Sequence, residues 1–197
     1  MDSLDKPSAD SHKVEVPDEQ SLLWLEEIEG ERALDWVKEQ NKLTLQALTR
    51  DPRFEEYQSE ALQILTASDR ITYGTLRGEF VYNFWRDEQH VRGIWRRMTL
   101  KQFRQESKQW EILLDIDQLA ETEKENWIYK GVDSLGPARE RCIIELAPGG
   151  TDTAAYREFD IPSHSFVKDG FNVPLAKTNL CWENRDQLLI ATDWGAG

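Results

Sequence analysis

The stretch Phe80-Val81-Tyr82-Asn83-Phe84-Trp85 decides the fold class of this chain. Gly78 lies before it and Asp87-Glu88 follow it, and its aromatic and β-branched residues favour an extended strand. Both alternating sets of side chains are apolar, whereas a strand with one face in water alternates between apolar and polar residues. We therefore expect a strand that is covered on both faces, as in a sheet lying between two others.

Further strand patterns follow along the chain, and most of the links between them lack helical periodicity. The Gly149-Gly150 pair predicts a tight turn, because glycine adopts positive φ at no steric cost. The links Leu100–Lys108 and Gln118–Lys124 leave room for short turns. The pattern indicates an antiparallel meander, with strands expected over residues 91–99, 110–115, 126–130, 141–147, 154–160, 165–168, 178–182 and 187–192.

The segment before these strands has a different periodicity and predicts two amphipathic helices. From Glu31 to near Thr49, apolar residues recur at every third or fourth position, which is the spacing of one helix face. Asp51-Pro52 is expected to open the second helix, since Asp accepts hydrogen bonds from free N–H groups and Pro fits the first turn. That helix should end at Ser68-Asp69.

A weak repeat overlies the strand pattern. Trp85 and Trp127 lie in similar surroundings 42 positions apart, and Leu114-Asp115-Ile116 resembles Phe159-Asp160-Ile161 at a separation of 45. A unit of three or four strands every ~40–50 residues is the spacing of a β-propeller blade. The chain has room for two blades and the first hairpin of a third, whereas propellers close with about four to eight. We expect either the front part of a longer protein or a chain that needs a partner.

The predicted fold is therefore mainly β with N-terminal α-helices: a partial β-propeller of about two to three blades of antiparallel strands, preceded by two amphipathic helices. Residues 1–20 are expected to be a flexible acidic leader, residues 21–69 an N-terminal helical segment, and residues 70–197 the incomplete N-terminal part of a propeller domain. The exposed edge of the last strand would be a site for association with another strand.

Composition excludes several classes of protein. The chain has 197 residues and a formal net charge of −13, of which residues 1–60 contribute −9. An acidic balance argues against nucleic-acid binding, which relies on a net basic face. No apolar run approaches the ~18 residues of a membrane span, and the N-terminus lacks the features of a secretory signal. Cys142 and Cys181 form no disulfide framework, so we expect a cytoplasmic protein.

One basic cluster interleaved with aromatic residues leaves two interpretations open. It could form a groove for RNA or an acidic peptide, with bases or side chains stacking on the aromatic rings. Alternatively, its members are solvated or pair with nearby acidic residues such as Glu79 and Asp115, which is the interpretation we favour. The cluster comprises Arg92, Arg96, Arg97, Lys101 and Arg104, with Trp95 and Phe103 among them.

Residue patterns for catalysis or metal binding are weak. His12, His90 and His164 lie far apart, and none has the spacing of a metal site. The run Gly131–Gly136 reads G-x-x-S-x-G, one residue away from a nucleophile elbow, but no helix follows it, so we interpret it as a loop joining strands. In Ser163-His164-Ser165 we see no acid placed to orient the imidazole.

Cys142 lies in an apolar run and is expected to be a small core residue. Phosphate-binding and dinucleotide-binding glycine motifs are absent. We expect no catalytic residue, no cofactor-binding residue and no metal site in this chain, and hence no cofactor.

Four stretches together resemble one known family. Trp24-Leu25-Glu26-Glu27, with Ala33 to Asn41 and Thr44-Leu45, resembles the N-terminal helices of the prolyl oligopeptidase family of serine peptidases (peptidase S9). The run from Val81 to Arg97 is similar to the first propeller blade of its bacterial members, and Glu125–Gly131 with Arg157–Asp160 resembles their second blade. The resemblance covers about residues 22–194. The leader departs from the family's short lead-in.

The resemblance implies more than this chain contains. Family members carry N-terminal helices, a seven-bladed propeller, and a C-terminal α/β-hydrolase domain with a Ser-Asp-His triad. They cleave short peptides, typically after proline, and the propeller filters substrates by size. No triad residue can be carried over to this sequence, so the chain alone should be inactive. The implied partners are the missing blades and hydrolase domain, and peptide substrates. The alternative is a stand-alone interaction module that associates through its exposed blade edge, with itself or with a hydrolase subunit.

Overall fold

The computed structural model describes residues 19–105 and 109–193. The predicted leader, residues 1–20, lies outside this range except for its last two residues. The chain divides into two compact units, residues 1–61 and residues 62–197, and α2 (Phe54–Thr66) spans the division. Each unit is described by itself.

The first unit is helical. The 3-10 helix η1 (Glu19–Glu26) is followed by α1 (Glu31–Leu48), whose bounds match the first predicted helix. Trp24 of η1 packs edge-on against Trp36 of α1 at 6.4 Å, and the Arg32 guanidinium lies 4.1 Å from the centre of the Trp24 ring. These contacts pack the 3-10 turn onto the first half of α1.

The second helix begins later than the sequence predicts. As predicted, the Asp51 carboxylate accepts a free backbone N–H, that of Arg53 at 2.9 Å, and it also binds the Arg53 guanidinium. The carbonyl of Asp51 accepts the N–H of Phe54, which closes a turn ahead of the helix. An Asp side chain that bonds to the backbone two residues on forms a turn of its own, and this turn delays α2 to Phe54.

The second unit begins with the four-stranded antiparallel sheet A, in the order β1-β2-β3-β4. Short helices follow β3 and β4 in the two links that leave room for turns. β1 was not predicted because it is only three residues long. The elements are β1 (Thr75–Arg77), β2 (Phe80–Trp85), β3 (Ile94–Thr99), α3 (Leu100–Phe103), β4 (Glu111–Asp115) and α4 (Ile116–Glu123).

Sheet B and a terminal hairpin complete the unit. Sheet B runs β5-β6-β7-β8, with β9 also paired to β7. The predicted turn before β7 is confirmed, since Gly149 and Gly150 both have positive φ. β9 was not predicted, because Pro174 interrupts its strand pattern. The strands are β5 (Trp127–Ser134), β6 (Arg141–Pro148), β7 (Ala154–Asp160), β8 (Ser165–Phe166), β9 (Asn172–Ala176), β10 (Thr178–Asn184) and β11 (Gln187–Thr192).

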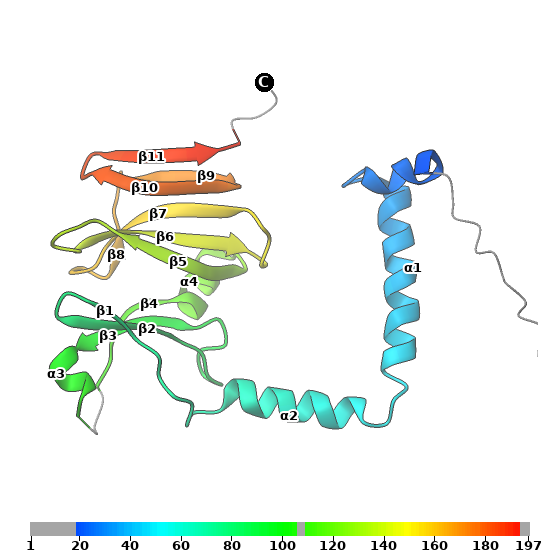
Figure 1. Cartoon of the computed structure of the whole chain (residues 1–197), viewed down its shortest axis with the longest axis horizontal. Coiled ribbons are helices and arrows are strands. Elements are labelled where there is room, and N and C mark those ends of the chain that lie inside the picture. Colours follow the sequence, from blue (N-terminus) through cyan, green and yellow to red (C-terminus); the bar gives the residue numbers. More distant parts are fainter. Residues whose placement is uncertain (1–18, 106–108, 194–197) are drawn as a thin grey trace, which may run out of the picture. The chain divides into compact units, whose positions relative to one another are not determined.

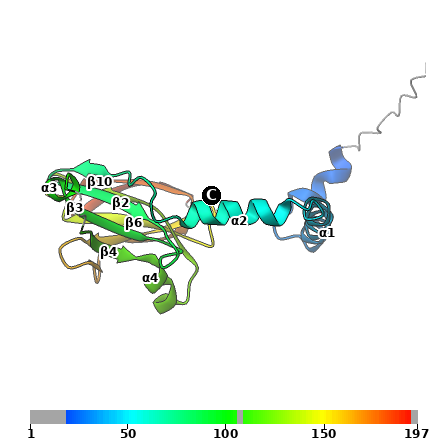
Figure 2. The ribbon, with the colours of Figure 1, turned by 90° about the horizontal axis from the view of Figure 1, so that it is seen from below.

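The sheets stack face to face, as Figure 1 shows for sheet A, sheet B and the β10–β11 hairpin in that order. Seen from below, strands of sheet A overlie those of sheet B (Figure 2). The core between sheets A and B contains Tyr82, Trp95, Ile144 and Phe159. In β2, Tyr82 faces sheet B and the neighbouring Val81 is only 3% exposed. The prediction that β2 is buried on both faces is confirmed, but in the described residues sheet A lies against another sheet on one face only.

The apparent repeat does not mark equivalent strands. Trp85 ends the second strand of sheet A, whereas Trp127 begins the first strand of sheet B. Strands in matching positions are further apart: β3 begins at Ile94 and β7 at Ala154, 60 residues later. The separations of 42 and 45 residues are therefore shorter than the true repeat length along the sequence. The repeat is longer because helix α3 adds residues between strands of sheet A, and helix α4 adds residues between sheet A and sheet B.

Candidate functional site

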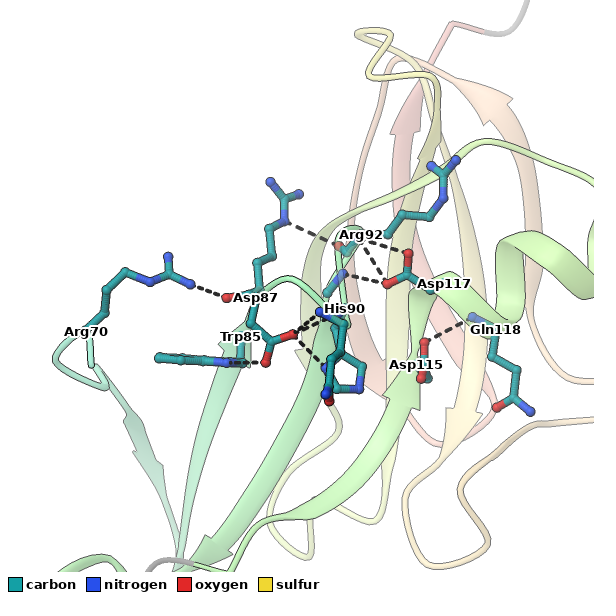
Figure 3. A network of polar contacts seen from close by, with 11 residues as sticks. Arg70, Trp85, Asp87, His90, Arg92, Asp115, Asp117 and Gln118 are labelled. Atoms are coloured by element: carbon teal, nitrogen blue, oxygen red, sulfur yellow. Dashed lines mark hydrogen bonds and ion pairs between the residues drawn. The ribbon is translucent and has the colours of Figure 1, made fainter. Parts of the chain in front are cut away.

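Polar contacts fix the β2–β3 loop to the start of sheet B. The Asp117 carboxylate, in the first turn of α4, accepts the backbone N–H groups of Arg92 at 3.0 Å and Gly93 at 3.3 Å (Figure 3). The Arg92 guanidinium reaches the side chain of Asn126 and the carbonyl of Trp127. Sequence analysis did not single out Asp117. No local motif marks this residue, because its partners Arg92 and Gly93 lie 25 and 24 residues away in the sequence.

His90 belongs to a second cluster, also shown in Figure 3. The Asp87 carboxylate accepts the Trp85 indole N–H at 2.9 Å and the backbone N–H of His90 at 2.8 Å, and lies 2.9 Å from His90 Nδ1. Burial acts to raise the pKa of Asp87, but the hydrogen bonds from His90, Trp85 and Gln89 outweigh it and lower the pKa. Its lowered pKa keeps the Asp87 carboxylate ionised at neutral pH, and its hydrogen bonds order the β2–β3 loop.

His164 links the two sheets. Its Nε2 lies 2.8 Å from Oε1 of Glu111 on β4, and Arg97 of β3 donates to the other oxygen of Glu111 at 2.7 Å. The expectation that no acid orients His164 is wrong, because the stacking of the sheets supplies one from far away in the sequence. The hydrogen bond from Arg97 lowers the pKa of Glu111 against the effect of burial, and His164 lowers it further.

The serines beside His164 do not form a catalytic triad with it. The Ser163 hydroxyl donates to Asp160 at 2.6 Å, and it lies 2.7 Å from the Ser165 hydroxyl. His164 itself has a positive φ of 53°, and its ring contacts Glu111 on the other sheet. In a triad the imidazole acts as the base of the nucleophilic serine. Here the imidazole bonds to Glu111 and the Ser163 hydroxyl bonds to Asp160, so the two do not form such a pair.

The G-x-x-S-x-G run is also structural. Gly131 to Ser134 belong to strand β5, so the interpretation of the whole run as a loop is wrong for its first four residues. Ser134 Oγ accepts a hydrogen bond from the Arg77 guanidinium of β1 at 2.8 Å. Because β5 turns into another strand and not into a helix, the serine is not presented as a nucleophile elbow would present it.

The basic cluster is dispersed. Arg96 and Arg97 are neighbours on β3 and therefore point to opposite faces of sheet A. Arg97 pairs with Glu111, Arg92 binds at the α4–β5 connection, and Lys101 lies on α3. The cluster is therefore spread over the β2–β3 loop, β3 and α3, and the acidic partner of Arg97 is Glu111, which is not one of the residues expected.

Other candidate chemistry is equally limited within the described range. Cys142 is fully buried in the core between the sheets, as expected, and burial raises the pKa of its thiol. The described residues contain no group of three His, Cys, Asp or Glu side chains able to hold a metal ion. A surface hollow of about 540 Å³ lies between residues 70–75 and the end of β2, and its lining holds no nucleophile–base pair. None of the described helices has the length and apolarity to cross a membrane.

Comparisons with known proteins give a consistent result. The family model for the N-terminal β-propeller domain of prolyl oligopeptidase matches residues 4–193. The chain is 40% identical over 175 residues to an uncharacterized peptidase of Sinorhizobium fredii, and 31% identical over 176 residues to one of Rickettsia prowazekii. These alignments cover 88% and 85% of this chain, but the chain spans only 24% of either relative.

Solved structures agree with this. A post-proline cleaving enzyme from Rickettsia typhi superposes with a TM-score of 0.79 at 30% identity, over 90% of this chain and 27% of that one. A structure from a study of two prolyl endopeptidases shares the fold, with a TM-score of 0.57 at 17% identity over 74% of this chain and 20% of that one. Since the family model matches almost every residue, the chain belongs to the prolyl oligopeptidase family through its N-terminal β-propeller domain.

Proposed function

We propose that this chain is the helical and propeller-forming N-terminal portion of a cytoplasmic peptidase that hydrolyses short peptides after proline. The catalytic Ser-Asp-His triad would come from an α/β-hydrolase domain encoded beyond residue 197. The propeller would act as a gate, because a ring of blades over an active site admits peptides, excludes folded proteins and shields the reaction from water. The 197-residue chain by itself would be inactive.

The observation that carries this proposal is the structural match to a post-proline cleaving enzyme over 90% of the chain. The two free cysteines support an intracellular location, since disulfides are rare in a reducing compartment.

The surface of the helices supports a partner in the full-length protein. Leu34 and Trp36 of α1 are 44% and 45% exposed, and Ile64 and Leu65 of α2 are 69% and 65% exposed. Apolar faces of this kind are normally buried against another element. We propose that the remaining propeller blades and the hydrolase domain cover exposed surface of this portion.

The test compares the chain with a polypeptide extended to the length of its relatives. We expect the extended protein to release p-nitroaniline from a succinyl-Gly-Pro substrate and to lose this activity to a serine-directed inhibitor. The matched Gly-Ala substrate should turn over far more slowly, and a folded protein should not be cleaved. The 197-residue chain should show no turnover. Inhibitor-sensitive cleavage by the chain alone, or equal rates on the Gly-Pro and Gly-Ala substrates, would contradict the proposal.

A second candidate function rests on the last strand. In the described part of the chain, β11 pairs only with β10, and its other edge has no strand partner. Leu189 on β11 is 57% exposed, so the edge combines free backbone groups with apolar side chains. A stand-alone interaction module would use this edge to associate with a second copy of the chain or a hydrolase subunit.

Size-exclusion chromatography with light scattering tests this second function. Edge pairing predicts a concentration-dependent dimer, and Leu189→Lys should restore the monomer, because charged side chains on an edge strand disfavour strand addition. Val91→Lys, at an exposed loop position, is the matched control and should leave the dimer intact. A wild-type chain that remains monomeric at high concentration would exclude self-association.

A further inference from the structure

Arg96 is a half-buried cation that lacks an acidic partner in the described part of the chain. Its guanidinium lies between two indole rings, 4.6 Å from the centre of Trp85 and 4.4 Å from that of Trp110. Its Nε donates to Asn83 Oδ1 at 2.8 Å. Burial lowers the pKa of Arg96 to about 10, against a weaker opposing effect of Asp87, whose carboxylate is already bonded to Trp85 and His90.

The adjacent Arg97 shows what Arg96 lacks. Arg97 donates to both oxygens of Glu111, at 2.7 and 3.0 Å, in the two-point geometry that a guanidinium and a carboxylate favour. It points towards sheet B, where His164 completes the cluster. Of two successive arginines on β3, one therefore has its carboxylate within this chain, and the other presents the same planar group on the opposite face.

That opposite face of sheet A has the character of an interface. Arg96 pairs across the strands with Ile112, which is 45% exposed and lies on the same face. Ile71 and Tyr73, in the segment that crosses beside β2, are 75% and 80% exposed. The Arg70 guanidinium also lies over the Trp85 ring, 4.8 Å from its centre, and adds another cation. In Figure 1 this face is the one directed away from sheet B.

The closed ring of a propeller indicates what covers the face of sheet A that is directed away from sheet B. In a propeller every blade lies between two neighbours around the central channel. Sheet B is one neighbour of sheet A, and the chain spans about a quarter of its relatives' length, so most of their sequence lies outside this portion. The second neighbour of the first blade is then the last one. This face combines two cations, Arg70 and Arg96, with aromatic and aliphatic side chains. It is therefore complementary to a strand that carries an acidic residue.

We propose that this face of sheet A receives the last blade of the propeller in the full-length polypeptide, and that a carboxylate from that blade binds Arg96 through two hydrogen bonds. The proposal rests on the proposed function only in requiring the remaining blades. The indoles of Trp85 and Trp110, together with the bond from Nε to Asn83, restrict the orientation of the Arg96 guanidinium. Its two terminal nitrogens are therefore pre-organised for a planar acceptor.

The first experiment compares Arg96→Gln and Arg97→Gln in the 197-residue chain and in the full-length protein, by the rate of cleavage of the native state by thermolysin. Arg97→Gln should raise the rate by the same factor in both, because its partner Glu111 is present in both. Arg96→Gln should raise it about tenfold more in the full-length protein than in the chain, the equivalent of one charge-assisted hydrogen bond. Arg96→Lys, which keeps the charge without the planar fork, should lose most of the same stabilisation. An equal effect of Arg96→Gln in both proteins would refute the proposal.

A second experiment identifies the partner. A photoreactive p-benzoylphenylalanine in place of Ile112 in the full-length protein should cross-link to an Asp- or Glu-containing strand in the last blade. Replacing that acid by its amide should reproduce Arg96→Gln, and the two changes together should cost no more than one. Cross-linking to the hydrolase domain, to a second copy or to nothing would refute the proposal. Peptidase activity of the wild-type protein is measured separately, so failure of the proposed function is distinguished from failure of this inference.

Discussion

Phe159→Ala should lower the free energy of unfolding of the β-sheet unit by about 3–5 kcal/mol. The Phe159 ring is fully buried between sheets A and B. It packs edge-on against Trp95 of sheet A at 6.0 Å and against Phe166 of sheet B at 5.3 Å. Truncation would remove one of the contacts that join the two sheets and leave a cavity that the paired strands on both sides prevent from collapsing.

Urea denaturation followed by circular dichroism measures this effect, with tryptophan fluorescence as a local probe of Trp95. A variant that is already unfolded without urea also agrees with the expectation, because the loss is comparable with the total stability of many small domains. Tyr73→Ala is the matched aromatic control: the side chain is 80% exposed, so its loss should change stability by less than about 0.5 kcal/mol. A Phe159→Ala variant within 1 kcal/mol of wild type would show that the sheets do not share this core.

Among the described glycines, Gly93→Ala should be the most harmful substitution, with a cost of about 3–5 kcal/mol from backbone strain and overpacking together. Gly93 has a φ of +105°, which residues with a Cβ rarely adopt. A Cβ would lie 2.5 Å from Phe84 Cζ and 2.9 Å from the carbonyl oxygen of Trp85. The backbone cannot relax freely, because Asp117 and Ile116 hold the N–H and C=O groups of Gly93.

Gly78→Ala is the matched control for this variant. Gly78 also has a positive φ, of +61°, but a Cβ there would meet nothing within 4 Å. Only the left-handed conformation is penalised, so we expect a loss of about 1–2 kcal/mol. Thermal unfolding of both variants measures the difference. Equal losses would mean that the contact of residue 93 with Phe84 carries no energetic weight.

Much of the fold could be predicted because its signals are local. The helix at residues 31–49 is indicated by apolar side chains three or four positions apart, and the strand at residues 80–85 by side chains two positions apart. The start of α2 was predicted a few residues too early, because a turn at Asp51 and Arg53 precedes the regular helix at Phe54. The repeat was misplaced, since similarity of two short stretches does not reveal which strand of a sheet each one occupies.

The sequence by itself determined the mainly β class, the N-terminal helices, the family and the lack of a recognisable catalytic motif, because these depend on composition, periodicity and short motifs. Only the tertiary structure decided that Glu111 meets His164, that Asp117 holds the β2–β3 loop, and that Arg96 and Arg97 serve different faces. The physical reason is that such contacts depend on strand register and on how the sheets stack. Both follow from packing between residues distant in sequence, which no local pattern encodes.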